Sequence, residues 1–279
     1  MKDSVNVLTI GNSFTDSLAE FFPQAAASAG CELKFHRANF GGCELERHWS
    51  YIKAEMADPM CRVYDGGNRL CEMLESCDWD FVTIQQASHM SWRAESFEPF
   101  AGNIIGYVRK FAPKAEIMIQ QTWAYRADSP RLQPEEWNIT QQEMHEKLTE
   151  NYRALSVRHG LRVIPTGLAV ALSRQETPVK YQGYDRAILN DLHWPDLPPQ
   201  AGDVVGQMTW MKDHETGSMK IGADYIHLNL RGDYMQACLW FAMLYGRKAT
   251  DVTFVPDDIA DDDAAFLREM AERARLEWK

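Results

Sequence analysis

Short apolar runs alternate with longer amphipathic segments along the first part of this chain. Runs of strand length occupy residues 5–10, 32–37, 80–85, 115–120 and 161–165. Patterns of helical period separate them over residues 17–29, 45–56, 97–111 and 135–159, the last beginning after Pro134. Strands that alternate with crossover helices form a parallel sheet covered on both faces. The pattern therefore predicts an α/β protein, a three-layer α/β/α sandwich around a parallel five-stranded sheet.

The alternation stops between about residues 172 and 223, where prolines mix with tyrosines and tryptophans. Long segments without regular structure are often functional loops, so we expect this insertion to wall a binding pocket. A helical run follows from Tyr234 to Tyr245, and a last helix is expected over residues 258–278. We predict one domain, residues 1–279, with this insertion.

Charge and composition exclude several classes of partner. The 279 residues carry a net charge of −11 with a pI near 5.2. Nucleic acids and anionic membranes both need basic patches, so neither is expected as a partner. No apolar stretch reaches the roughly 20 residues of a membrane span. A strand-like run begins close to Met1, which indicates a cytoplasmic protein, or a periplasmic or secreted one if a leader was removed. The oligomeric state is left open.

The residues that commonly bind metals show no metal-site spacing. Six cysteines lack a CxxC pair, and eight histidines include no HExxH motif. We expect no metal and no cofactor.

A candidate nucleophile follows the first apolar run. Residues 5–10 lead into Gly11-Asn12-Ser13, and a helical pattern begins a few residues later. The loop after a parallel strand opens at the carboxyl edge of the sheet, where α/β folds place their ligands. The N–H groups of the following helix can then stabilise negative charge. Ser13 fits a nucleophile, although Ser13 or Asp16 as a simple helix cap is the alternative.

A candidate base and acid lie more than two hundred residues further on. A serine hydroxyl needs a base such as histidine, which in turn needs a carboxylate to orient it. Asp224 and His227, three residues apart, supply these groups. A histidine buried in the core and an aspartate in a turn would be the alternative. The pair Asp191 and His193, followed by Trp194, is better suited to a loop that contacts substrate.

Five motifs, in this order, resemble the SGNH (GDSL-like) hydrolase superfamily. They are GNSF from Gly11, GGCELERH from Gly41, Gln85-Gln86, QTWAY from Gln121 and Asp224-x-x-His227. Their wording is similar to a branch catalogued mainly as a domain of unknown function. The resemblance implies a flavodoxin-like fold.

The resemblance also implies roles for individual residues. Ser13 is the expected nucleophile, His227 the base and Asp224 its orienting acid. The oxyanion hole is expected to combine the Ser13 N–H, the Gly42 N–H and a side-chain amide. The superfamily has an asparagine at the amide position, whereas this chain offers Gln85 or Gln86.

Several further residues are expected to bind substrate. His89 and the pair Trp123 and Tyr125 follow the third and fourth strands, while His193 and Trp194 lie in the insertion. Aromatic rings stack well on sugars. We therefore predict a serine esterase that removes a small acyl group, most simply acetyl, from a small-molecule or oligosaccharide ester. A lipid, thioester or carboxyl-methyl esterase on the same scaffold, or a non-catalytic carbohydrate-binding protein, is the alternative.

Overall fold

The computed structural model describes residues 2–278, and a five-stranded parallel sheet lies at its centre. The strands run in the spatial order β2-β1-β3-β4-β5. Their bounds are β1 (Ser4–Gly11), β2 (Glu32–Asn39), β3 (Phe81–Ile84), β4 (Glu116–Gln120) and β5 (Arg162–Ile164). These agree closely with the predicted strands, and the predicted α/β sandwich is confirmed. Central strands of a parallel sheet are buried on both faces, which explains their continuous apolar runs.

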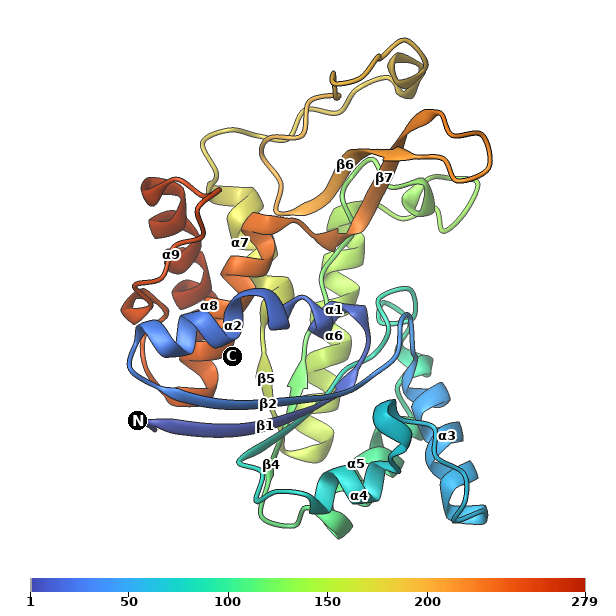
Figure 1. Ribbon diagram of the computed structural model, residues 1–279, viewed down its shortest axis with the longest axis vertical. Helices are drawn as coiled ribbons and strands as arrows, with labels where there is room; N and C mark the ends of the chain where they lie inside the picture. The colour runs from blue at the N-terminus through green and yellow to red at the C-terminus, as the bar shows by residue number, and fades with distance from the viewer. Residues whose placement is uncertain (1, 279) are drawn as a thin grey trace.

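Helices cover both faces of the sheet (Figure 1). One face carries α2 (Leu18–Ser28), α7 (Thr166–Glu176), α8 (Leu230–Tyr245) and α9 (Asp261–Glu277). The other carries α3 (Leu45–Ala57), α4 (Leu70–Glu75), α5 (Phe100–Phe111) and α6 (Gln141–His159). The short helix α1 (Ser13–Asp16) follows β1 directly. Single 3₁₀ turns are η1 (Asp65–Gly67), η2 (Ala94–Ser96), η3 (Pro130–Leu132), η4 (Arg186–Asn190) and η5 (Ala249–Asp251).

Helix α8 is buried on most sides after its first turn, because it packs between neighbouring helices and the sheet. Its residues from Tyr234 to Leu239 are all buried. The predicted C-terminal helix is present as α9, whose first turn carries three aspartates that suit the positive end of the helix dipole. Among residues 2–278, no helix combines the length and the apolar character needed to cross a membrane.

Helix α6 begins six residues later than predicted. Pro134 and the acidic residues after it are typical of a helix start, but they lie in a turn after η3. The helix begins instead at a capping box. The Glu143 N–H donates to Thr140 Oγ1 (3.1 Å), and Glu143 Oε2 accepts from the Thr140 N–H (2.7 Å). Two satisfied backbone groups at this point outweigh the favourable first-turn residues upstream.

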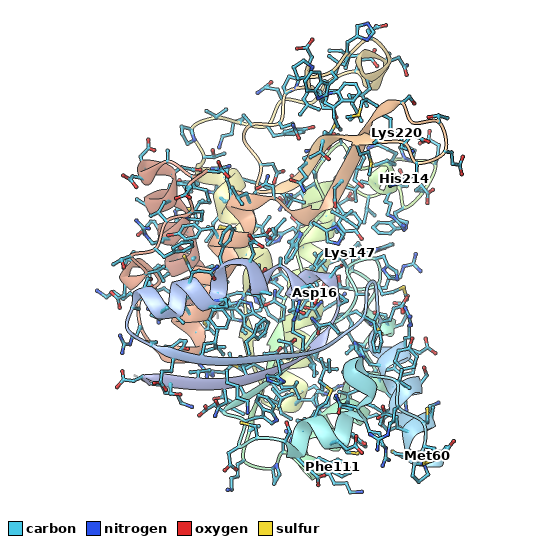
Figure 2. All side chains as sticks on the ribbon, in the orientation of Figure 1. Asp16, Met60, Phe111, Lys147, His214 and Lys220 are labelled. Carbon is cyan, nitrogen blue, oxygen red and sulfur yellow. The ribbon has the colours of Figure 1, made fainter. Side chains whose placement is uncertain are left out.

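The predicted insertion is only partly irregular. Helix α7 continues to Glu176, residues 177–204 are irregular apart from η4, and an antiparallel hairpin follows. The hairpin consists of β6 (Val205–Lys212) and β7 (Met219–Leu228). In Figure 2, His214 and Lys220 mark the far end of the hairpin, and Asp16 marks α1 at the sheet edge below it. The hairpin lies within the segment predicted to be irregular, and the alternation of β7 breaks at Ile226, inside the bulge.

Candidate active site

The nucleophile candidate occupies the first position of α1, immediately beyond β1. Asn12 caps this helix, because its Oδ1 accepts a hydrogen bond from the Phe14 N–H (3.1 Å). Ser13 is half-buried, and its hydroxyl is not used as a cap. The cap is therefore neither of the two residues, Ser13 and Asp16, that the capping alternative named.

A chain of two hydrogen bonds connects Ser13, His227 and Asp224, here called the Ser–His–Asp array. Ser13 Oγ lies 2.9 Å from His227 Nε2, and His227 Nδ1 lies 2.7 Å from Asp224 Oδ2. Burial raises the pKa of Asp224, but hydrogen bonds from the His227 ring and two backbone N–H groups outweigh it and hold the pKa at about 2. The carboxylate is therefore charged at neutral pH and can stabilise an imidazolium next to it.

A bulge in β7 brings the acid and the histidine to the same side. In a regular strand, residues three apart point to opposite faces. Here Val205 pairs with Leu228 and Gln207 with Asp224, so Gly206 alone lies opposite residues 225–227. Asp224 Oδ1 accepts the N–H groups of residues 226 (2.8 Å) and 227 (2.9 Å), which closes the bulge into a turn.

Trp123 packs against this turn from the protein interior. Its side chain is therefore not accessible to a substrate. Only 1% of its surface is exposed, which corrects the expectation that it binds substrate. Its ring stacks on Phe14 with centroids 4.0 Å apart, and its Nε1 donates to the Ile226 carbonyl (2.8 Å). Phe14 follows Ser13 and Ile226 precedes His227, so one tryptophan contacts neighbours of both groups.

Tyr125 is likewise buried, which corrects its prediction as a substrate contact. Its exposed fraction is 1%, its hydroxyl is 2.8 Å from Ser88 Oγ, and its ring packs against Trp137. Tyr125 follows β4 along the chain as predicted, but its side chain points into the protein.

The residues expected to form the oxyanion hole differ in their exposure and in their hydrogen-bond partners. Gly42 is exposed in a turn with a φ of +61°, and Asn12 Nδ2 donates to the adjacent Cys43 carbonyl (3.0 Å), which ties this turn to the nucleophile loop. Gln85 is buried, and its amide nitrogen donates to Asn12 Oδ1. The amide of Gln85 is therefore directed toward the loop that carries Ser13.

Gln86 is not available for the oxyanion hole. Its Nε2 donates to the Ser96 carbonyl (2.8 Å) and hydroxyl (3.1 Å), and its Oε1 accepts from the Leu45 N–H (3.0 Å). Gln86 lies two residues beyond the end of β3, and its amide is directed to Ser96 and not to the loop that carries Ser13.

His89 is half-exposed and pairs with Glu44, a residue that the sequence analysis did not single out. His89 Nε2 lies 2.9 Å from Glu44 Oε1, and both side chains are about 30% exposed. Glu44 also lines a cavity of about 410 Å³ together with Arg47 and Met90.

His193 and Trp194 lie far along the irregular segment. Both are exposed, Trp194 by 67%. The segment is attached to β6, since Trp210 Nε1 donates to the Asp196 carbonyl (2.9 Å), and Figure 1 shows it beyond the hairpin from α1. The structure therefore does not bring these two residues to Ser13 as expected.

A buried histidine that sequence reasoning missed supports the end of β1. His48 Nε2 donates to the Gly11 carbonyl (2.9 Å), and its Nδ1 is 3.2 Å from the Tyr64 hydroxyl. Burial lowers the pKa of His48 to about 4, so the ring is neutral at neutral pH. The histidine stands in the motif that begins at Gly41, but the sequence does not indicate its partner.

Nothing in the described part of the chain gathers into a group of three or more His, Cys, Asp or Glu side chains that could hold a metal. The parallel sandwich and the position of the Ser–His–Asp array at its carboxyl edge place the protein in the SGNH-hydrolase class of folds.

The chain belongs to the DUF4886 family. The model of that family, described as a domain of unknown function, matches residues 6–187. The match includes Ser13 and ends before Asp224. The predicted resemblance to a branch catalogued as a domain of unknown function is thereby confirmed. No curated protein matches this chain in sequence.

Solved structures share the fold. A DUF4886 family protein from Bacteroides uniformis is 22% identical over 99% of this chain and 96% of its own, with a TM-score of 0.76. A candidate SGNH hydrolase from Slackia heliotrinireducens is 18% identical over 86% of this chain and 98% of its own, with a TM-score of 0.52. A candidate GDSL-like lipase from Parabacteroides merdae is 12% identical over 88% of this chain and 97% of its own, with a TM-score of 0.50.

Proposed function

We propose that this protein is a serine esterase that removes a small acyl group, acetyl in the first instance, from a carbohydrate ester. The observation that carries the proposal is the continuous hydrogen-bonded chain from Ser13 through His227 to Asp224, with distances of 2.9 and 2.7 Å. A nucleophile, a base and an orienting acid in this order are the recurrent arrangement of serine hydrolases on unrelated folds.

The chemistry follows from the geometry. Ser13 Oγ attacks the ester carbonyl while His227 Nε2 takes the hydroxyl proton, and Asp224 stabilises the imidazolium. The Ser13 and Gly42 N–H groups are proposed to stabilise the oxyanion, each donor contributing about 2.7–4 kcal/mol. The Gln85 amide is buried and donates to Asn12, so its proposed task is to hold the loop that carries Ser13. His227 then gives its proton to the leaving alcohol. Water, activated by the same nitrogen, hydrolyses the acyl-enzyme.

The openness of the site favours a small acyl group on a large polar alcohol. The side chains of His227 and Asp224 remain 39% and 33% exposed. A long acyl chain gains binding energy only when its apolar surface leaves water. An open edge accommodates a sugar instead, and the exposed Trp194 offers a ring to an extended polysaccharide that continues past the hairpin.

The test is hydrolysis of p-nitrophenyl acetate and an acetylated oligosaccharide by wild type, Ser13→Ala and His227→Ala, with intact mass after a fluorophosphonate probe. Matched controls are Ser50→Ala, whose hydroxyl bonds within α3, and His36→Ala, an exposed histidine on β2. We expect turnover to fall by at least about 10³-fold in the first two variants and to be unchanged in the controls. The probe adduct should require Ser13.

The alternatives have their own signatures. A preference for long acyl p-nitrophenyl esters would indicate a lipid esterase, and turnover of thioesters or methyl esters alone would indicate those substrates. Glycan binding that persists in Ser13→Ala, without adduct or turnover of any ester by wild type, would replace the proposal with a carbohydrate-binding role.

A further inference from the structure

We propose that Arg126 is a positioning residue whose buried guanidinium, held by Asp128, fixes the β7 bulge that carries Asp224 and His227. The inference rests on the proposed function of the Ser–His–Asp array. It assigns a task to a residue that no motif of the sequence marked.

Arg126 is an unusual side chain for the interior. Its side chain is 1% exposed, and it forms a two-pronged ion pair with Asp128, with Nε–Oδ1 at 2.7 Å and Nη2–Oδ2 at 3.1 Å. Burial lowers the pKa of Arg126, but the hydrogen bond and charge of Asp128 outweigh it, so the group stays a cation. Its Nη1 atom is buried without a hydrogen-bond partner among residues 2–278.

Such an arrangement contributes little to folding. A buried ion pair is often no more stabilising than an apolar replacement of the same size, and an unpaired buried nitrogen adds a cost. The free energy of folding therefore does not explain why a guanidinium is buried at this position.

The reason lies in what Arg126 touches. Its backbone N–H donates to the Tyr225 carbonyl (3.0 Å), and its guanidinium lies 5.3 Å from the centroid of the Tyr225 ring. Tyr225 stands in the bulge, directly after Asp224. The hairpin register passes from Asp224 directly to Leu228, so the contacts from Arg126 reach Tyr225 from outside the hairpin.

The opposite strand leaves room for this contact. Gly206 has a φ of +82°, and a Cβ there would lie 2.8 Å from the Asp224 carbonyl and 3.1 Å from Arg126 Nη1. A side chain at this position would push apart the guanidinium and the main chain of the acid. The absence of a side chain is thus what allows Arg126 to pack against the bulge.

The guanidinium also contacts the irregular segment. Its carbon lies 4.9 Å from the ring centroid of Tyr181. The cation therefore contacts one ring from residues 177–204 and another from the catalytic strand. Both contacts depend on the planar guanidinium, which a lysine ammonium does not reproduce.

The experiment compares Arg126→Lys and Tyr225→Leu with a control, Arg162→Lys, at a more exposed arginine–carboxylate pair. Arg162 makes a similar two-pronged pair with Glu116 (2.5 and 3.0 Å), but at the starts of β5 and β4, the opposite edge of the sheet from Ser13. Two readouts are used: the rate of Ser13 labelling by a fluorophosphonate, and the proton resonance of the His227 Nδ1–H that bonds to Asp224.

We expect Arg126→Lys and Tyr225→Leu each to slow labelling by about 10- to 100-fold, because a misplacement near 1 Å costs that much. The His227 resonance should broaden or be lost by exchange. Labelling and resonance should stay at wild-type values in Arg162→Lys, and Tyr225→Phe should retain most of the labelling rate because it keeps the ring. The double variant should be no slower than the slower single variant, since both act on the same contact.

Three results would overturn the inference. In the first, Arg126→Lys lowers the melting temperature while labelling rate and resonance stay unchanged, which indicates a purely structural role. In the second, the two substitutions act additively. The third is a Tyr225→Leu variant with wild-type readouts, which remains decisive if Arg126→Lys does not fold. If wild type is not labelled at all but its His227 resonance still depends on Arg126, the proposed function fails and the positioning role stands.

Discussion

The replacement Trp123→Phe should reduce activity far more than its effect on stability alone would explain. The indole ring stacks on Phe14 at 4.0 Å with an interplanar angle of 5°, and its N–H donates to the Ile226 carbonyl at 2.8 Å. Phenylalanine keeps a ring for the stack but has no donor. The perturbation is therefore one lost hydrogen bond beneath the β7 bulge, together with part of the packing.

The magnitude follows from these two contacts. The lost hydrogen bond contributes about 0.5–1.5 kcal/mol, and a carbonyl left without its donor costs about 1–3 kcal/mol where water does not reach it. Ile226 is half-buried, so the lower part of that range applies. We expect the free energy of unfolding to fall by about 2 kcal/mol. Since Ile226 adjoins His227, the released carbonyl lets the histidine move, and kcat should fall by about 10- to 100-fold.

The assay pairs urea unfolding with the rate of Ser13 labelling and uses Trp240→Phe as the control. Trp240 is also fully buried, and its Nε1 donates to Gln120 Oε1 at a similar distance of 2.9 Å. The hydrogen-bond and ring partners shown for Trp240 are Gln120 and Phe22, which do not adjoin Ser13, Asp224 or His227 in the chain. The control should lose a similar amount of stability and keep its labelling rate. Equal losses of rate in both variants would refute the positioning role of Trp123.

Three polar side chains that are partly or fully buried offer further tests. The carboxylate of Asp224, with its pKa held at about 2, should stabilise the fold above about pH 4 and lose that contribution as the pH falls toward 2; Asp224→Asn should lack this dependence in acid unfolding curves. Burial, and then repulsion by a nearby glutamate, raises the pKa of Asp233 to about 8, so wild-type stability should decline as the pH rises from about 4 to 8. Asp233→Asn should be more stable than wild type at pH 8 by at least about 1 kcal/mol, and a lower melting temperature for the variant at that pH would contradict the assignment. His48→Phe removes the donor to the Gly11 carbonyl and should cost about 1–3 kcal/mol in thermal unfolding with slower labelling of Ser13, whereas unchanged labelling would show that β1 holds its end without this bond.

Several features could be predicted because they depend on short-range patterns. Each strand of the parallel sheet is a continuous apolar run between helical segments, and burial on both faces requires that composition. Ser13 and the pair Asp224 and His227 could be proposed because few side-chain types can act as nucleophile, base and acid. These inferences need only residue identity and order along the chain.

Some predictions were wrong because two local sequence signals favoured different structures. Pro134 and the glutamates after it favour a helix start, yet the capping box between Thr140 and Glu143 satisfies more backbone groups six residues later. The hairpin of β6 and β7 was not predicted, because the prolines and aromatic residues before it favoured an irregular insertion and the alternation of β7 breaks at the bulge.

The sequence by itself determined the layers, the strand order along the chain and the identity of the three groups in the Ser–His–Asp array, since these follow from composition, period and chemistry. Only the tertiary structure decided where side chains at the strand ends point. Trp123 and Gln86 both stand at the carboxyl edge, yet one turns beneath the nucleophile and the other toward Ser96. The physical reason is that a strand end specifies a position, whereas the direction of a side chain depends on which buried partners satisfy its polar atoms.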